Sequence, residues 1–89
     1  MFELIEGKSM TLLREMHTSL VDWETRYILE ALSYEKARLL QINQTSEDED
    51  AAADAGNDYI ELASFYKRFE AEAVAVFGEQ IKNFSREPL

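Results

Sequence analysis

The sequence predicts an all-α protein, a long antiparallel helical hairpin of two helices that dimerises into a four-helix bundle. Three observations favour this fold. The 89 residues form a single domain and include one Pro and three Gly, so long stretches contain no helix breaker. Apolar residues recur at the 3,4 spacing of a coiled-coil seam, whereas strand periodicity fits nowhere. One candidate turn, at residues 43–46, divides this pattern into two halves.

The first helix is expected to run from about residue 9 to residue 43. Ser9 is a candidate N-cap, and neither Gly nor Pro occurs between it and Gly56. At 100° per residue, the seam occupies a sector of roughly 80°. Its members are Leu13, Met16, Leu20, Trp23, Tyr27, Ala31 and Tyr34. The residues that widen this stripe are Val21, Ile28, Leu32, Leu39 and Ile42.

The second helix is expected over about residues 46–84, followed by a short tail, 85–89. Ser46 and Glu49 match a capping box, and the acids around them suit the positive end of a helix dipole. An acidic linker before a later helix start at Asp58 is the alternative, with residues 56–57 as a possible break. The second seam comprises Ala55, Tyr59, Leu62, Tyr66, Phe69, Ala73 and Val76, flanked by Ala63, Phe77, Ile81 and Phe84.

Dimerisation is expected because the apolar stripes are wider than one seam. A lone hairpin buries one seam and leaves the other half of each stripe in water, which offsets little of the entropy lost on folding. Further apolar residues lie outside the seams: Leu29, Leu40, Ile60, Phe65 and Val74. Exposed apolar patches of this kind usually mark an interface, so a homodimer is expected.

The net charge of −9 is concentrated in the middle of the chain. Residues 39–66 hold seven acids and no base. Nucleic acids and anionic membranes are therefore not expected as partners, since phosphate binding needs clustered Lys and Arg. The absence of Cys excludes disulfides and thiolate chemistry. The first ten residues do not resemble a secretory signal, and no apolar run would span a bilayer, so a cytoplasmic protein is expected.

One candidate site is a polar group within the apolar sector of the first helix. It comprises His17, Glu24, Glu35 and Arg38, with Glu24 near the centre of the sector. A buried carboxylate costs several kcal/mol unless it is paired or protonated. These residues either form a polar site inside the bundle, fix the register of a partner helix, or lie at a solvated rim.

The other candidate site is an acidic stripe on the second helix, formed by Glu47, Asp50, Asp54, Asp58 and Glu61. These residues fall within roughly 80° of one another on a helix. With Ile60 and Phe65 as apolar anchors, the stripe is a candidate docking surface for a basic protein. The alternative is a solvated face that keeps the protein soluble.

No metal, cofactor or catalytic residue is expected. An EF-hand loop with Gly56 at its sixth position would place Ala51, Ala53 and Ala55 at ligand positions. A di-iron bundle needs Glu-x-x-His, but Arg14 occupies the Glu position before His17, the only histidine.

Three functional hypotheses follow. The first is a non-enzymatic protein–protein interaction module, acting as a regulator, adaptor or small chaperone in the form of a dimeric acidic hairpin. The second is an acidic inhibitor or nucleic-acid mimic that occupies a basic surface of a partner, as in phage–host conflict. The third is a magnesium-dependent all-α nucleotide pyrophosphohydrolase. Such enzymes carry Glu-x-x-Glu on one helix and Glu-x-x-Asp on another. This chain resembles them through Glu47-x-x-Asp50, while its only Glu-x-x-Glu lies at Glu3 and Glu6.

Overall fold

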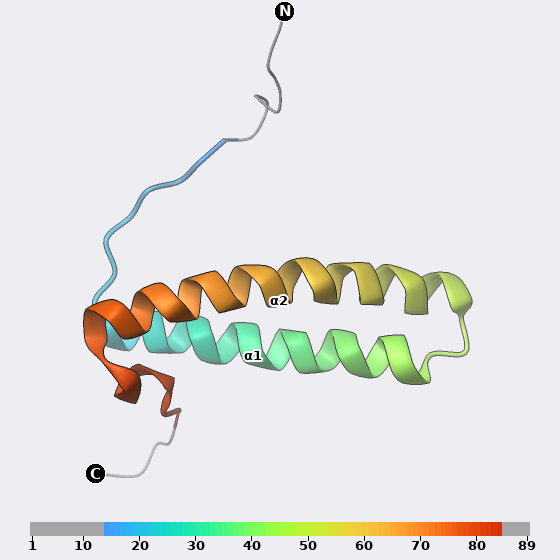
Figure 1. The fold of residues 1–89 in the computed structure, drawn as a ribbon. Coiled ribbons are helices and arrows are strands. Elements are labelled where there is room, and N and C mark those ends of the chain that lie inside the picture. Colours follow the sequence, from blue (N-terminus) through green and yellow to red (C-terminus); the bar gives the residue numbers. More distant parts are fainter. Residues whose placement is uncertain (1–13, 85–89) are drawn as a thin grey trace, which may run out of the picture.

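Two antiparallel α-helices lie side by side and are joined by a short turn (Figure 1). The computed structural model describes residues 14–84. Helix α1 spans Asp22–Thr45, helix α2 spans Glu49–Phe77, and a short 3₁₀ helix, η2, spans Glu79–Lys82. The described residues contain no strand, and the predicted all-α helical hairpin is confirmed. We call the turn end the tip, and the end where α1 begins and α2 finishes the open end.

Helix α1 begins at Asp22, so the expected start near residue 9 is wrong within the described residues. Residues 14–21 are not helical, and the candidate cap Ser9 lies outside the described part. The start at Asp22 has a local cause. The carboxylate of Glu24 accepts a hydrogen bond from the Val21 N–H at 2.9 Å, and Thr25 Oγ1 donates to the Val21 carbonyl at 3.0 Å. Asp22 and Glu24 also place negative charge at the positive end of the dipole.

The turn lies slightly later than expected, and its cap is a different residue. Asp48 is the N-cap of α2, because its side chain accepts from the backbone N–H groups of Asp50 and Ala51. Ser46, which we expected to cap α2, instead follows the last residue of α1, and its Oγ accepts from the Asp48 N–H at 3.1 Å. The acidic residues 48–50 thus form the start of α2, and the alternative of an acidic linker before Asp58 is wrong.

Helix α2 continues through Gly56 without the break considered at residues 56–57. Gly56 has a packing role here. A Cβ at this position would stand 2.6 Å from Nδ2 of Asn43, which donates to the Ala52 carbonyl at 2.9 Å. The missing side chain therefore lets Asn43 of α1 reach the backbone of α2 near the tip.

Helix α2 ends at Phe77, earlier than the expected limit near residue 84. Gly78 has φ 94° and ψ 171°, a conformation that is essentially restricted to glycine. The chain reverses at this residue, and η2 then packs against both helices at the open end. The reversal brings Ile81 into the core, so Ile81 and Phe84 do not flank a seam on one long helix as expected.

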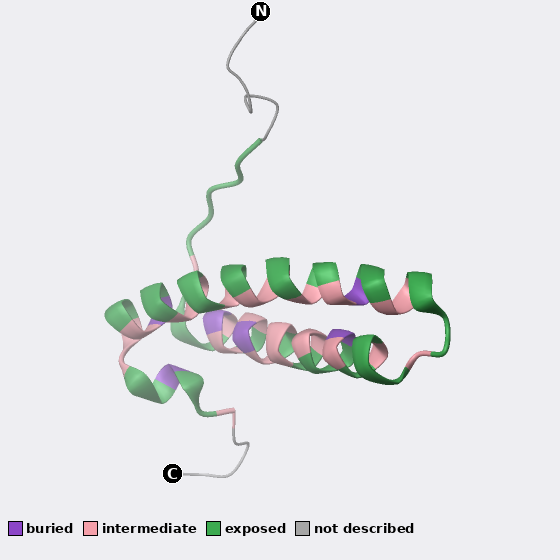
Figure 2. Ribbon diagram, turned by 45° about the vertical axis from the view of Figure 1, so that its right-hand side comes forward, coloured by how far each residue is buried: buried purple, intermediate pink, exposed green. Residues whose placement is uncertain are grey.

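The main hydrophobic core lies at the open end and joins all three elements. Leu29 of α1, Ala73 of α2 and Ile81 of η2 are buried, with exposed fractions of 0%, 5% and 1%. Five partly buried residues pack against them: Tyr66, Phe69, Val74, Phe77 and Phe84. Near the tip, Leu39 and Ala55 are also buried. Figure 2 shows that burial follows the facing sides of the helices and that their outer sides are exposed.

The inner face of α1 is not the expected seam. Its buried residues are Thr25, Leu29 and Leu39, whereas Trp23, Tyr27, Ala31 and Tyr34 are exposed. On α2, by contrast, the expected seam faces inward from Ala55 to Ala73, and only Val76 departs from it with an exposed fraction of 68%. Leu29, expected outside the seam, is the most buried residue of α1.

Gly56 and Gly78 should respond differently to substitution by alanine. Gly78→Ala should lower the free energy of unfolding by roughly 1 to 3 kcal/mol, because an L side chain disfavours this backbone conformation. Its Cβ would also lie 2.6 Å from Oε1 of Gln80. Gly56→Ala is the matched control. It gains about 1 kcal/mol of helix propensity but displaces Asn43, so its net change should stay within about 0.5 kcal/mol. Denaturant titration checks both, and equal losses would contradict the assigned role of Gly78.

The cap assignment makes a second prediction. Asp48→Ala should cost about 0.5 to 2 kcal/mol, because two first-turn N–H groups lose their acceptor. Ser46→Ala should cost less, since Ser46 bonds only within the turn. Thermal melts of both variants beside the parent measure the difference. A larger loss for Ser46→Ala would restore Ser46 as the cap.

Candidate interaction surfaces

Helix α1 carries a row of exposed aromatic side chains, Trp23, Tyr27 and Tyr34, which we call the aromatic face. Their exposed fractions are 56%, 58% and 69%. Trp23 and Tyr27 form an edge-to-face pair with ring centroids 5.9 Å apart and an interplanar angle of 88°. This geometry is favourable for aromatic rings and holds the two side chains in a defined arrangement. Trp23 and Tyr27 are therefore held in a fixed relation to each other while both remain exposed.

The aromatic face lies on the side of α1 that is opposite α2. At 100° per residue its three members fall within a sector of about 40°, which is about 180° from the buried Thr25 and about 140° from the buried Leu29. Helix α2 therefore cannot cover it. Trp and Tyr are also enriched in protein–protein interfaces, because each joins a large apolar ring to a polar group.

The predicted buried polar group does not form inside this chain. His17 and Arg38 are exposed, with side-chain exposed fractions of 86% and 60%, and the Glu35 side chain is 42% exposed. Glu24 is partly buried and bonds the Val21 N–H at the start of α1. Glu24, Glu35 and Arg38 lie beside or opposite the inner face of α1, which is set by Leu29. His17 lies in the non-helical segment before α1.

Two of these residues form a local ion pair. Arg38 Nε and Nη2 donate to the two carboxylate oxygens of Glu35 at 2.8 and 2.7 Å. The Arg38 hydrogen bond and charge lower the pKa of Glu35. His17 lies 3.4 Å from a carboxylate oxygen of Glu15 in the segment before α1. Neither pair builds a site within the hairpin.

The acidic stripe is exposed along its length, but its anchors are arranged differently from the prediction. Asp50, Asp54, Asp58 and Glu61 are exposed on α2, while Glu47 is exposed in the turn before the helix. Ile60 is 67% exposed but lies about 120° around α2 from the stripe.

Phe65 does lie on the same side of α2 as the stripe, and it already has neighbours. Its ring centroid is 5.7 Å from that of Phe69, and the Arg68 guanidinium lies 5.6 Å above it. With an exposed fraction of 40%, it is the less accessible of the two proposed anchors.

A charged residue that sequence reasoning missed lies between the helices. Lys36 occupies the inner face of α1, and its ammonium is 4.2 Å from the centre of the Tyr66 ring. Burial, followed by the neighbouring carboxylate of Glu70, raises the pKa of Tyr66. The signal was present in the sequence, because Lys36 continues the 3,4 spacing of Leu29, Leu32 and Leu39. A long side chain can bury its stem there and still direct its charge at an aromatic ring.

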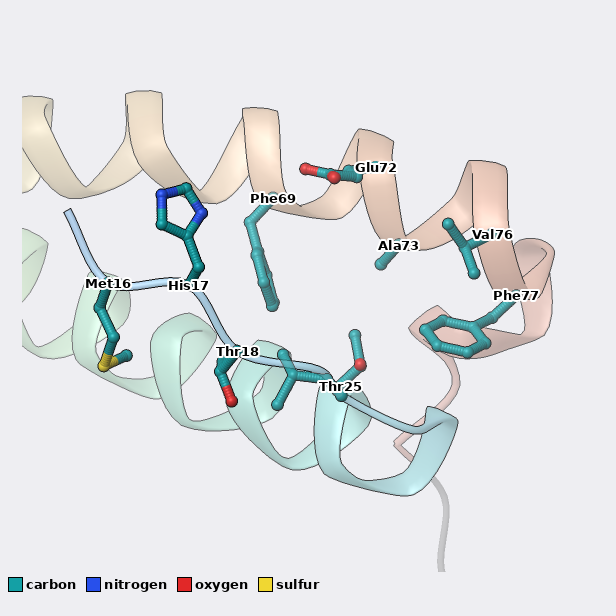
Figure 3. Close-up of a pocket in the computed structure, with 10 residues that line it drawn as sticks. Met16, His17, Thr18, Thr25, Phe69, Glu72, Ala73, Val76 and Phe77 are labelled. Carbon is teal, nitrogen blue, oxygen red and sulfur yellow. The ribbon is translucent and has the colours of Figure 1, made fainter.

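A cavity of about 440 Å³ lies at the open end, between residues 16–20 and the two helices (Figure 3). Phe69, Ala73 and Phe77 form its apolar wall, and Thr25 contributes from α1. In the close-up, His17 and Glu72 lie towards one rim of the cavity. The segment before α1, which we expected to be helical, is exposed over residues 14–19 and leaves the hairpin at the open end (Figure 1).

The described residues contain no group of three or more His, Cys, Asp or Glu side chains arranged to hold a metal ion. Glu3 and Glu6, part of the hydrolase hypothesis, lie outside them. No helix of the described part has the length and apolar character needed to cross a membrane. Comparison with protein-family models, curated proteins and solved structures gave no match.

The environment of Tyr66 predicts how its ionisation responds to Glu70. Removing that charge in Glu70→Gln should lower the pKa of Tyr66, because the neighbouring carboxylate opposes formation of a phenolate. Glu72→Gln, at an exposed position of α2, is the control. NMR titration of the Tyr66 ring signals measures the change, and identical midpoints in both variants would contradict it.

The same raised pKa has a consequence for stability. A group whose pKa is higher in the folded state releases its proton first from the unfolded chain. The contribution of Tyr66 is therefore complete below its ordinary value of 10.0 and is lost as the pH rises through the folded value. Tyr66→Phe should weaken the alkaline dependence of the unfolding free energy.

Proposed function

We propose that this chain is a non-enzymatic protein–protein interaction module that acts as a self-associated acidic helical hairpin. The observation that carries the proposal is the aromatic face. Three large rings are more than half exposed on the side of α1 that α2 leaves uncovered. Apolar rings in such a row contribute strongly to association when another helix covers them.

The small size of the core supports the same proposal. Only Leu29 and Ile81 are large side chains that are fully buried in the described part. Met16, Ile60 and Val76 are each at least two-thirds exposed. A helical hairpin with so little buried apolar area gains stability when a partner covers its remaining apolar surface.

The second candidate function, an acidic inhibitor of a basic partner, is supported by the acidic stripe. Its carboxylates are exposed, and no basic residue occurs among residues 39–66 to neutralise them. The two candidates differ in their response to salt. Association of aromatic surfaces between two acidic chains should persist or strengthen as salt rises, whereas docking to a basic surface should weaken steeply.

Sedimentation equilibrium tests the proposed self-association. At protein concentrations of about 50 µM the mass should be near twice 10.3 kDa, and it should rise or stay constant with added salt. Circular dichroism of the same samples establishes that the chain is helical. A cooperatively folded monomer at this protein concentration, with and without added salt, would contradict the proposal and favour the second candidate.

A further inference from the structure

We infer that the aromatic face is covered by α1 of a second copy, packed antiparallel, with a two-fold axis passing between Glu30 and Ala31. This inference rests on the proposed function and specifies the partner of the same face. It follows from the order of side chains along α1. In an antiparallel two-fold pair, residues that are equally distant from the axis face each other.

The aromatic and basic residues placed opposite one another by this axis are chemically complementary. Tyr27 faces the partner's Tyr34, and by symmetry Tyr34 faces the partner's Tyr27. Trp23 faces the partner's Arg38 at each end of the contact. The exposed residues of this set lie within about 60° on the outer side of α1, so one helix can contact all of them. Ala31, which is small and exposed, lies beside the axis and lets the helices approach.

Arg38 is prepared for this contact by its own chain. Its guanidinium edge is held by the two carboxylate oxygens of Glu35 at 2.8 and 2.7 Å, while the side chain remains 60% exposed. A guanidinium bound along its edge still presents a flat face, which is the surface that stacks on an indole ring. Glu35 thus fixes the orientation of Arg38, and the positively charged guanidinium stacks on the indole ring of Trp23 of the partner.

The available surface is adequate for a weak but specific dimer. Each aromatic side chain offers about 150 to 250 Å², so the exposed parts of six rings supply roughly 700 Å². The surface of Ala31, Arg38 and Gln41 between and beyond the rings can then bring the total to about 1,000 Å², the lower limit for a specific interface.

The charge distribution favours this arrangement over one that joins the α2 helices. Residues 39–66 carry seven acids and no base, and all seven acids lie on α2 or in the turn before it. Pairing through α1 keeps the two α2 helices, with their acidic stripes, at opposite outer edges, where their repulsion is smallest. The assembly is then a single layer of four helices, with α1 of each copy in the middle, and differs from the four-helix bundle expected at first.

Cross-linking tests the position of the axis, because the chain has no natural cysteine. Ala31→Cys lies beside the proposed axis, and Ala71→Cys is a matched control, since Ala71 is an exposed alanine on α2. Under oxidised glutathione, Ala31→Cys should form disulfide-linked dimers at least about tenfold faster, because its thiols are held close in the complex. Equal rates, or faster linkage through residue 71, would overturn the inference.

Equilibrium measurements test the contacts themselves. Trp23→Ala and Arg38→Ala should each raise the dimer dissociation constant about tenfold or more, and the double variant should lose less than the product of both. Val76→Ala, which removes an exposed apolar side chain on α2, should leave the constant within about twofold. A dimeric parent that Trp23→Ala does not weaken would overturn this inference alone. A monomeric parent would overturn the proposed function with it.

Discussion

The packing of Ile81 against Leu29 and Ala73 is the contact on which the rest of the fold depends. It is the point where α1, α2 and η2 meet, and it contains both of the large side chains that are fully buried in the described residues. The contact exists because Gly78 adopts a positive φ and reverses the chain after α2. Without that reversal two helices would meet along one line, and Leu29 would lack a cover. The C-terminal turn is therefore part of the domain's core.

The position of Leu29 also explains which surface is left for a partner. A helix that directs Leu29 and Leu39 towards its neighbour must direct residues half a turn away to the outside, and on α1 these are Trp23, Tyr27 and Tyr34. The exposed rings are thus a geometrical consequence of the core. Their polar atoms reduce the cost of exposure in a single chain, and their apolar area remains available for association.

The helical hairpin could be predicted from the spacing of apolar residues and the lack of breakers, but the inner face of α1 could not. Two sets of residues on α1 share the 3,4 spacing, one containing Trp23 and Tyr27 and the other containing Leu29 and Leu32. Spacing alone does not rank them. The predicted seam followed the aromatic set and continued back to Leu13, yet residues 14–21 are not helical.

The acidic and polar residues were also harder to interpret than the apolar pattern, because several have local roles. Glu24 bonds the first turn of α1, Asp48 caps α2, and Glu35 pairs with Arg38. A helical projection cannot distinguish such roles from a buried site, since helix ends are the least certain feature of any sequence-based assignment. The acidic stripe was easier to place, because Asp54, Asp58 and Glu61 lie on the inner turns of a long helix.

The location of the core at the open end has a consequence for the order in which the hairpin assembles. Residues at the tip, such as Asn43 and Ala52, are close in sequence, so their contact closes a short loop at little entropic cost. Leu29 and Ile81 are separated by most of the described chain and must close the longest loop. Loop entropy therefore favours the contacts at the tip early in assembly and those at the open end late. In the folded state local opening follows burial instead. The core lies at the open end, whereas residues 47–50 are exposed, so a protease should find its earliest cleavage sites at the acidic turn.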